Sequence, residues 1–293
     1  MNIFKALFGG KEENPEEKKR QEEARQFDVL KYDGVRALRM GQSAYAVQCF
    51  THALDLKDDL ECHDYLSQAL ISCNELPQAY EQLLKLAEAD SDNQQIFLRM
   101  AQVAFLMENY GVMGDACEKA MLIDDKNPVV YYLYARACRG QGDDSNAVAM
   151  LTKAINMKED YGEAYLLRGE IYLALGELDN ASADAAYLDE HAEENEDVML
   201  LGARIKMAQK KYDAAKSAYD RIIDHNPFCA VAFRERSSVK AQLGDNEGSE
   251  QDMRTAEEID PQSDESRTAM SQNVENNVKQ IYKNNDPYGV FSN

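Results

Sequence analysis

The apolar residues of this chain recur at the spacing of helices that come in pairs. Between residues 164 and 175 they stand at Tyr165, Leu166, Ile171, Tyr172 and Leu175. This spacing predicts a helix with one apolar side, and Gly176 then ends it as a left-handed cap. Leu178 and Asp179 begin a second helix, whose apolar stripe is Ala181, Ala185 and Leu188. The segment therefore predicts a helix, a tight turn and a second helix.

The same pattern repeats every 34 residues. One column of the repeat is Phe97, Tyr131, Tyr165, Met199 and Phe233, and another is Ala120, Ala154, Leu188, Ile222 and Ala256. A glycine column contains Gly142, Gly176 and Gly244, with Lys210 in the remaining place. Pro227 and Pro261 also lie one period apart and are expected to stop the second helix of their units. Several columns with one period indicate a repeat protein.

This pattern resembles the tetratricopeptide repeat family. The stretch from Ala164 to Ala181 matches the helix–turn–helix core of that family closely, and the segments 230–261 and 128–157 match it as well. The resemblance implies an all-α fold, a right-handed superhelical solenoid of about seven helix–turn–helix repeats with a C-terminal capping helix. The resemblance is specific for the fold and says little about the function of the chain.

The pattern divides the chain into a solenoid over residues 14–282 and two tails, a flexible one over 1–13 and another over 283–293. Asn14, Pro15, Glu16 and Glu17 supply the cap, first-turn proline and acids that are typical of a helix start. The repeats are expected at approximately 27–59, 60–93, 94–127, 128–161, 162–195, 196–229 and 230–263, followed by the capping helix at 264–282.

The net charge of the chain argues against some classes of binding partner. Its 32 basic and 53 acidic residues give a net charge of −21. Nucleic-acid binding requires a basic surface, so we expect no nucleic acid as partner. No stretch reaches the roughly 18 apolar residues of a membrane helix, so we also expect no integral membrane segment. These exclusions favour a protein or peptide partner.

The sequence shows no pattern for catalysis or for a metal or other cofactor. Its four histidines are dispersed without an i,i+4 pair, and the acidic run over 184–197 has no calcium-loop spacing. The six cysteines lack a Cys-x-x-Cys motif, and buried thiols in a reducing compartment explain them best. We expect a non-catalytic, cytoplasmic protein.

The resemblance implies that the first helices line a concave groove, with positions i, i+4 and i+7 of each helix pointing into it. These positions include Leu98, Gln102, Phe105, Tyr132, Arg136, Arg139, Leu166, Glu170, Leu173, Leu200, Arg204, Met207 and Arg234. Apolar side chains and arginines are frequent among them, although the protein is acidic.

The hypothesis for this groove is a peptide or helix with apolar anchors and acidic groups, since arginine suits carboxylates. In the alternative, the arginines pair with acids of adjacent helices and stabilise the stack. The family's clamp for chaperone C-termini requires asparagine a turn after lysine, but Val35 follows Lys31. A co-chaperone role through that clamp is therefore not supported.

Arg168 and Arg236 stand at a packing position where other units have Leu66, Met100 or Tyr134. We expect their aliphatic stems to pack while the guanidinium groups reach an acid such as Asp184 or Asp252.

The ends of the chain supply further hypotheses. Ile3, Phe4, Leu7 and Phe8 form a short apolar stripe, so residues 1–10 are candidates for a weak membrane or partner contact. Residues 286–291 are a candidate recognition motif. Self-association, for example as a homodimer through terminal repeats or tails, is the main alternative to an adaptor.

Overall fold

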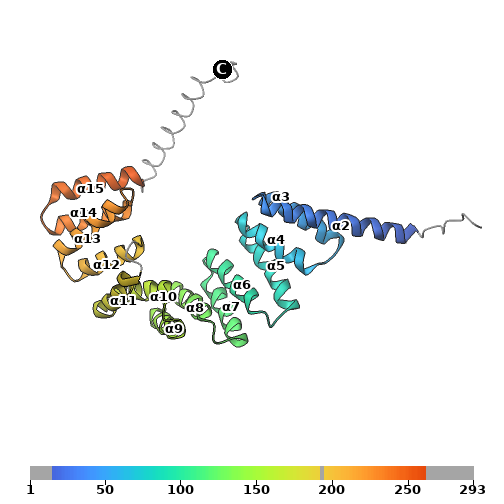
Figure 1. Cartoon of the computed structure of the whole chain (residues 1–293), viewed down its shortest axis with the longest axis horizontal. Helices are drawn as coiled ribbons and strands as arrows, with labels where there is room; N and C mark the ends of the chain where they lie inside the picture. Colours follow the sequence, from blue (N-terminus) through green and yellow to red (C-terminus); the bar gives the residue numbers. More distant parts are fainter. Residues whose placement is uncertain (1–14, 192–194, 262–293) are drawn as a thin grey trace, which may run out of the picture. The chain divides into compact units, whose positions relative to one another are not determined.

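The computed structural model describes residues 15–191 and 195–261, and every regular element within these ranges is an α-helix (Figure 1). The chain divides into two compact units, residues 1–160 and 161–293. In each unit, every helix packs most extensively on the partner that follows or precedes it in a pair. This arrangement confirms the predicted all-α fold of helix–turn–helix repeats for the described residues.

Within residues 15–160, the first unit contains four helix pairs. They are α2 (Pro15–Arg39) with α3 (Ser43–Leu56), α4 (Leu60–Ser72) with α5 (Leu76–Ala89), α6 (Gln94–Leu106) with α7 (Tyr110–Ile123), and α8 (Pro128–Gly140) with α9 (Asp144–Met157). The helix that starts at Pro15 runs without a break into the first repeat, which makes α2 the longest of these helices.

Over residues 161–191 and 195–261, the second unit contains three helix pairs. They are α10 (Gly162–Ala174) with α11 (Leu178–His191), α12 (Glu196–Ala208) with α13 (Tyr212–His225), and α14 (Ala230–Gln242) with α15 (Asn246–Ile259). Pro227 and Pro261 follow the ends of α13 and α15, as expected of residues that stop a helix.

Each pair turns at one residue with a left-handed backbone. These residues are Gly41, Asn74, Glu108, Gly142, Gly176, Lys210 and Gly244, whose φ lies between 55° and 83°. The predicted caps at Gly142, Gly176, Lys210 and Gly244 are confirmed. Asn74 and Glu108 complete the column although neither is a glycine. The packing of the two helices therefore imposes this conformation even where the residue type does not favour it.

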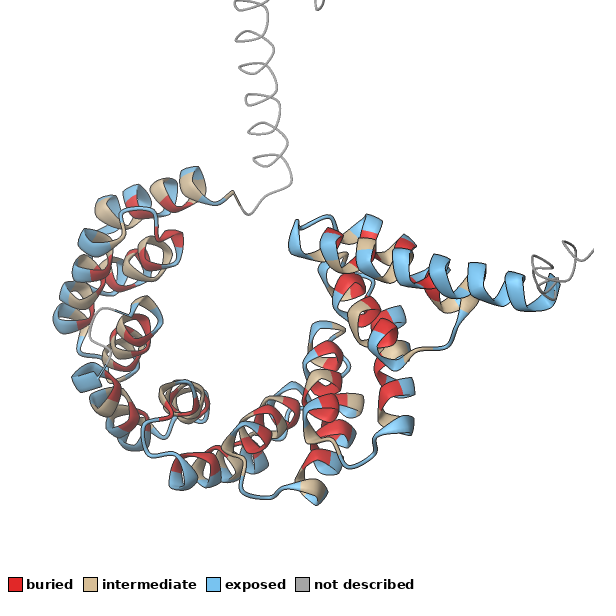
Figure 2. Ribbon diagram, turned by 45° about the vertical axis from the view of Figure 1, so that its right-hand side comes forward, coloured by how far each residue is buried: buried red, intermediate tan, exposed pale blue. Residues whose placement is uncertain are grey.

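Buried residues run as stripes along the helices of each unit (Figure 2). Small residues allow close approach: a Cβ added to Gly169 would lie 2.9 Å from Leu201 Cδ2. Ala181 is fully buried in the stripe predicted for α11, and Ala185 is half-buried and packs against the same apolar cluster. Asp184 is also buried, and an arginine of α10 holds its carboxylate.

Several predicted segments lie outside the described residues. They are the tail over 1–13 with its apolar stripe, Asn14 of the predicted helix start, Glu193 and Glu194 of the acidic run, the capping helix over 264–282 and the tail over 283–293. These assignments, and the predicted repeat boundaries, stay predictions.

Candidate interaction surface

In the first unit, α6 and α8 bring an aromatic and a cationic side chain into contact. Cζ of Arg136 lies 3.6 Å from the ring centroid of Phe105 and 5.8 Å from that of Tyr132. All three side chains are half-buried, while Gln102 and Arg139 on the same two helices are exposed. We call these five residues the α6–α8 surface.

The guanidinium of Arg136 contacts two aromatic rings. Within the described residues it has no hydrogen bond and no ion pair. A guanidinium carries five N–H donors, and stacking on a ring leaves them directed outward in its plane. The α6–α8 surface therefore offers donors for a carboxylate beside half-buried aromatic area.

Leu98 is part of the core. It is 6% exposed and belongs to the cluster that joins α6 to its neighbours, with Met100 and Val103. Leu98 and Gln102 lie about one turn apart on the same side of α6, but Leu98 is buried and Gln102 is exposed. Leu98 therefore contributes packing at this place.

In the second unit, the predicted positions fall into two groups. Leu166, Glu170 and Leu173 on α10 and Met207 on α12 are half-buried. Leu200 is 5% exposed and packs in the core with Ala203 and Tyr219. The apolar residues of this set thus contribute largely to packing between successive helices.

Arg204 and Arg234 pair with acids inside the second unit. Nη2 of Arg204 lies 2.8 Å from Oε1 of Glu235, and Nε donates to the same carboxylate at 2.9 Å. Nη2 of Arg234 lies 3.1 Å from Oδ2 of Asp260. Burial opposes the charge of Arg204, but the hydrogen bonds to Glu235 outweigh it and raise the pKa of Arg204. At these two positions the arginines stabilise neighbouring helices, which is the alternative reading of the pattern.

The semi-buried arginines behave as predicted. Nε and Nη2 of Arg168 donate to Oδ2 and Oδ1 of Asp184 at 2.9 and 2.7 Å, so the pair is bidentate. Arg236 holds Asp252 in the same way at 2.8 and 2.7 Å. Both pairs connect the two helices of one repeat.

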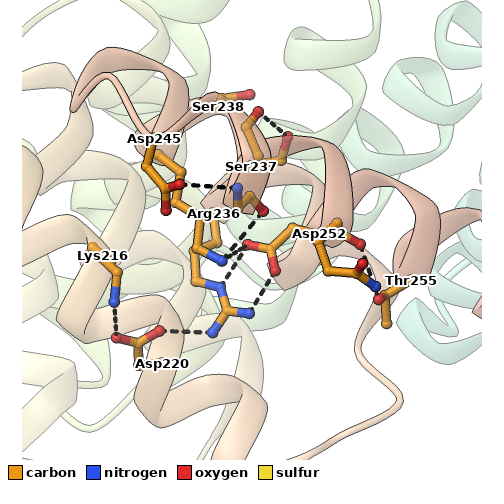
Figure 3. A network of polar contacts seen from close by, with 12 residues as sticks. Lys216, Asp220, Arg236, Ser237, Ser238, Asp245, Asp252 and Thr255 are labelled. Carbon is orange, nitrogen blue, oxygen red and sulfur yellow. Dashed lines mark hydrogen bonds and ion pairs between the residues drawn. The ribbon is translucent and has the colours of Figure 1, made fainter.

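Around Arg236 the pair extends into a network (Figure 3). Nη1 of Arg236 donates to Oδ1 of Asp220 on α13 at 2.7 Å, and Lys216 holds the other oxygen of Asp220 at 2.9 Å. Nζ of Lys240 lies 2.9 Å from Oδ2 of Asp252. Burial by itself would raise the pKa of both carboxyl groups. The bonds to Arg236 and the lysines outweigh it and lower the pKa of Asp252 and of Asp220 below the ordinary value.

Lys31 of the first unit is also engaged internally. Its Nζ lies 2.9 Å from Oδ1 of Asp59 and 2.6 Å from Oε2 of Glu61. Burial opposes its charge, but the bonds to Glu61 and Asp59 raise the pKa of Lys31. Together with Val35 one turn later, this leaves no clamp for a C-terminal carboxylate at α2.

The described residues contain no cluster of three or more side chains suited to hold a metal ion. His63 is buried, with its ring nitrogens 2.7 Å from oxygens of Gln82 and Asp58. All six cysteines have free thiols, and burial raises the pKa of Cys62 and Cys117 to about 12. The thiols of Cys62 and Cys117 are therefore protonated at neutral pH.

Comparison with known proteins decides the family. Two family models described as tetratricopeptide repeat match this chain, one over residues 128–161 and 162–185 and the other over residues 200–264. The chain is a tetratricopeptide repeat protein. No curated protein matches its sequence.

Solved structures of other tetratricopeptide repeat proteins share the fold. A tetratricopeptide repeat protein from Parabacteroides merdae ATCC 43184 is 12% identical, with 83% of this chain and 97% of that chain covered and a TM-score of 0.70. PilW, a type IV pilus biogenesis factor, is 15% identical, with coverage of 72% and 98% and a TM-score of 0.63. YrrB, a protein with an unusual peptide-binding site, is 16% identical, with coverage of 64% and 97% and a TM-score of 0.50. Such low identities show a common fold alone.

Tetratricopeptide repeat proteins generally mediate interactions between proteins. None of the helices described in this chain is long and apolar enough to cross a membrane. The sequence pattern does not indicate Glu235 as the partner of Arg204, because the two residues lie in different repeats. Nor does the pattern within one repeat indicate a cleft above α12, which Ser182, Gly202 and Ala218 help to line. The signal for that cleft lies in the repeat columns, where small residues replace charged ones at corresponding places.

Proposed function

We propose that this tetratricopeptide repeat protein is a non-catalytic scaffold that binds a peptide or helix of a partner protein on the α6–α8 surface. The observation that carries the proposal is Arg136, whose guanidinium stacks on Phe105 and has no acidic partner within the described residues. In an acidic protein such a cation favours a ligand with negative charge.

The ligand that fits has an apolar anchor next to a carboxylate. Phe105 and Tyr132 present half-buried rings that can take an apolar side chain, and large aromatic residues with arginine are typical of binding hot spots. The planar fork of Arg136 matches a carboxylate in two hydrogen bonds. YrrB, described as having a peptide-binding site, shows that this fold is compatible with peptide binding.

We place the protein in the cytoplasm. Six free thiols, five of them buried, are stable in a reducing compartment and are not needed for disulfides. Burial holds the pKa of Cys62 and Cys117 near 12, so these thiols are poor nucleophiles at neutral pH. This composition supports a packing role for the cysteines and no catalytic one.

The test is affinity capture from the native cells with the full chain as bait, followed by mass spectrometry. The wild type is compared with Arg136→Glu, which reverses the charge of the α6–α8 surface. Arg254→Glu is the matched control, because Arg254 is exposed on α15 and its substitution changes the net charge equally. Circular dichroism melting verifies that all three proteins are folded.

We expect specific partners to be recovered with the wild type and with Arg254→Glu and to fall at least tenfold with Arg136→Glu. Equal recovery with all three baits would refute the α6–α8 surface as the binding site. Recovery of additional copies of the chain itself would support the self-associating alternative in its place.

A further inference from the structure

Two of the three repeats in the second unit carry a buried Arg–Asp pair, and the repeat between them lacks it. Arg168 pairs with Asp184, and Arg236 pairs with Asp252, at corresponding places 68 residues apart. At the midpoint of this interval, Gly202 replaces the arginine and Ala218 replaces the aspartate. The middle repeat therefore contains neither the arginine nor the aspartate of the pair.

Two other residues of the Arg236 network also have smaller counterparts one period earlier in the chain. Asp220 and Lys216, which complete the network in the last repeat, correspond to Ala186 and Ser182 one period earlier. The one charged residue that persists is a lysine, since Lys240 corresponds to Lys206. Small side chains thus replace all but one member of the network.

These replacements leave a cleft of about 510 Å³ between α11 and α13, with α12 as its floor. Its lining includes Ser182, Ala186, Gly202, Lys206 and Ala218. Apart from the backbone of its own helix and its chain neighbours, a Cβ added to Gly202 would meet one atom of the described residues within 4 Å, Nζ of Lys206 at 3.8 Å. The cleft is open at the place that an arginine fills in the neighbouring repeats.

Lys206 lacks the carboxylate that its counterpart has. Nζ of Lys240 lies 2.9 Å from Asp252, whereas Nζ of Lys206 has one long hydrogen bond, 3.5 Å to the carbonyl of Gly202, and no ion pair within the described residues. Lys211 and Arg221 line the same cleft, along with Asp179 and Asp189. Among the lining residues that the structure describes, cations therefore outnumber acids, although the whole chain has a net charge of −21.

We propose that this cleft binds an acidic side chain, glutamate or aspartate, of a partner protein, with its carboxylate at Lys206. The carboxylate occupies the space that Asp252 fills beside Lys240 in the last repeat. Ala186, Gly202 and Ala218 accept the aliphatic part of the side chain. This site lies on the α11–α13 side of α12 and is separate from the α6–α8 surface, so it does not depend on the proposed function.

The probe is a phage-displayed library of random 12-residue peptides, selected on the wild-type full chain. Phages that also bind the double variant Gly202→Arg, Ala218→Asp are removed, because this variant restores the Arg–Asp pair of the neighbouring repeats and closes the cleft. The Kd of each synthesised peptide is then measured by fluorescence anisotropy.

We expect the selected peptides to contain glutamate or aspartate and to lose at least tenfold in affinity when that residue becomes glutamine or asparagine. Lys206→Met, which keeps the stem and removes the charge, is expected to weaken binding as strongly. Arg136→Glu is expected to leave it unchanged. Peptides that bind Lys206→Met as tightly as the wild type, or a selection that yields none sensitive to closing the cleft, would overturn the proposal.

Discussion

At the scale of single residues, the turn inside each helix pair shows how tertiary packing overrides residue preference. Gly41, Gly142, Gly176 and Gly244 adopt positive φ without strain, because they have no Cβ. Asn74, Glu108 and Lys210 adopt the same conformation with a side chain. A left-handed backbone costs such a residue about 1 kcal/mol or more, and the packing of the two helices against each other offsets this cost.

Glu108→Gly is expected to raise the free energy of unfolding by about 1 kcal/mol, because glycine relieves the left-handed strain at φ 55°. Gly142→Ala at φ 79° is the matched opposite change and is expected to lower it by about 1 kcal/mol. Guanidinium denaturation followed by circular dichroism measures both. A change of the same sign in the two variants would contradict this account of the turns.

At the scale of helices and their pairs, buried ion pairs and apolar residues are alternative ways of filling one position. Arg168 and Asp184 join α10 to α11 through two hydrogen bonds, and both side chains are largely buried. The corresponding residues two repeats earlier are Met100 and Ala116, which are buried in an apolar cluster. The same helix–turn–helix geometry therefore accepts either solution.

Arg168→Met is expected to cost about 3–5 kcal/mol of stability, because it leaves the carboxylate of Asp184 buried without its cation. The double variant Arg168→Met, Asp184→Ala introduces the apolar pair of the third repeat and is expected to recover most of that loss. Denaturation midpoints of the two variants and the wild type provide the comparison. If the double variant were as unstable as the single one, packing of the arginine stem and not the ion pair would dominate.

At the scale of the whole molecule, the two units differ in what holds their repeats together. Around α6 and α7 of the first unit the core is an apolar cluster that includes Met100, Val103 and Met113. Around α14 and α15 of the second unit, Arg236 and Lys240 hold buried carboxylates. The packing of α14 on α15 therefore depends on charge to a greater degree than the packing of α6 on α7.

Acid is accordingly expected to loosen α14 and α15 before α6 and α7. The pKa of Asp252 and of Asp220 is lower in the fold than the ordinary 3.8, despite burial, because Arg236 and the neighbouring lysines hold the carboxylates. These two carboxylates contribute fully to stability at a pH above 3.8, the ordinary pKa. Their contribution is lost as the pH falls from 3.8 toward the lower pKa that they have in the folded protein. Hydrogen exchange of the full chain at pH 7 and pH 3 measures this, and equal loss of protection in both regions would contradict it.

The sequence by itself determined the features that depend on residues within one repeat. The 34-residue period, the paired helices, the glycine turns and the contact of Arg168 with Asp184 all follow from spacing along one helix–turn–helix. Local spacing fixes which side chains meet in such a unit, so the sequence predicted these features directly.

Only the tertiary structure decided which cationic side chains are available to a ligand. Arg136 and Arg204 occupy corresponding positions, yet Arg204 pairs with Glu235 of the next repeat while Arg136 stacks on Phe105 of the preceding one. The cleft above Gly202 likewise arises from side chains that are missing on three helices at once. Such features depend on contacts between repeats, where the distance in space is short and the separation along the chain is about a full period.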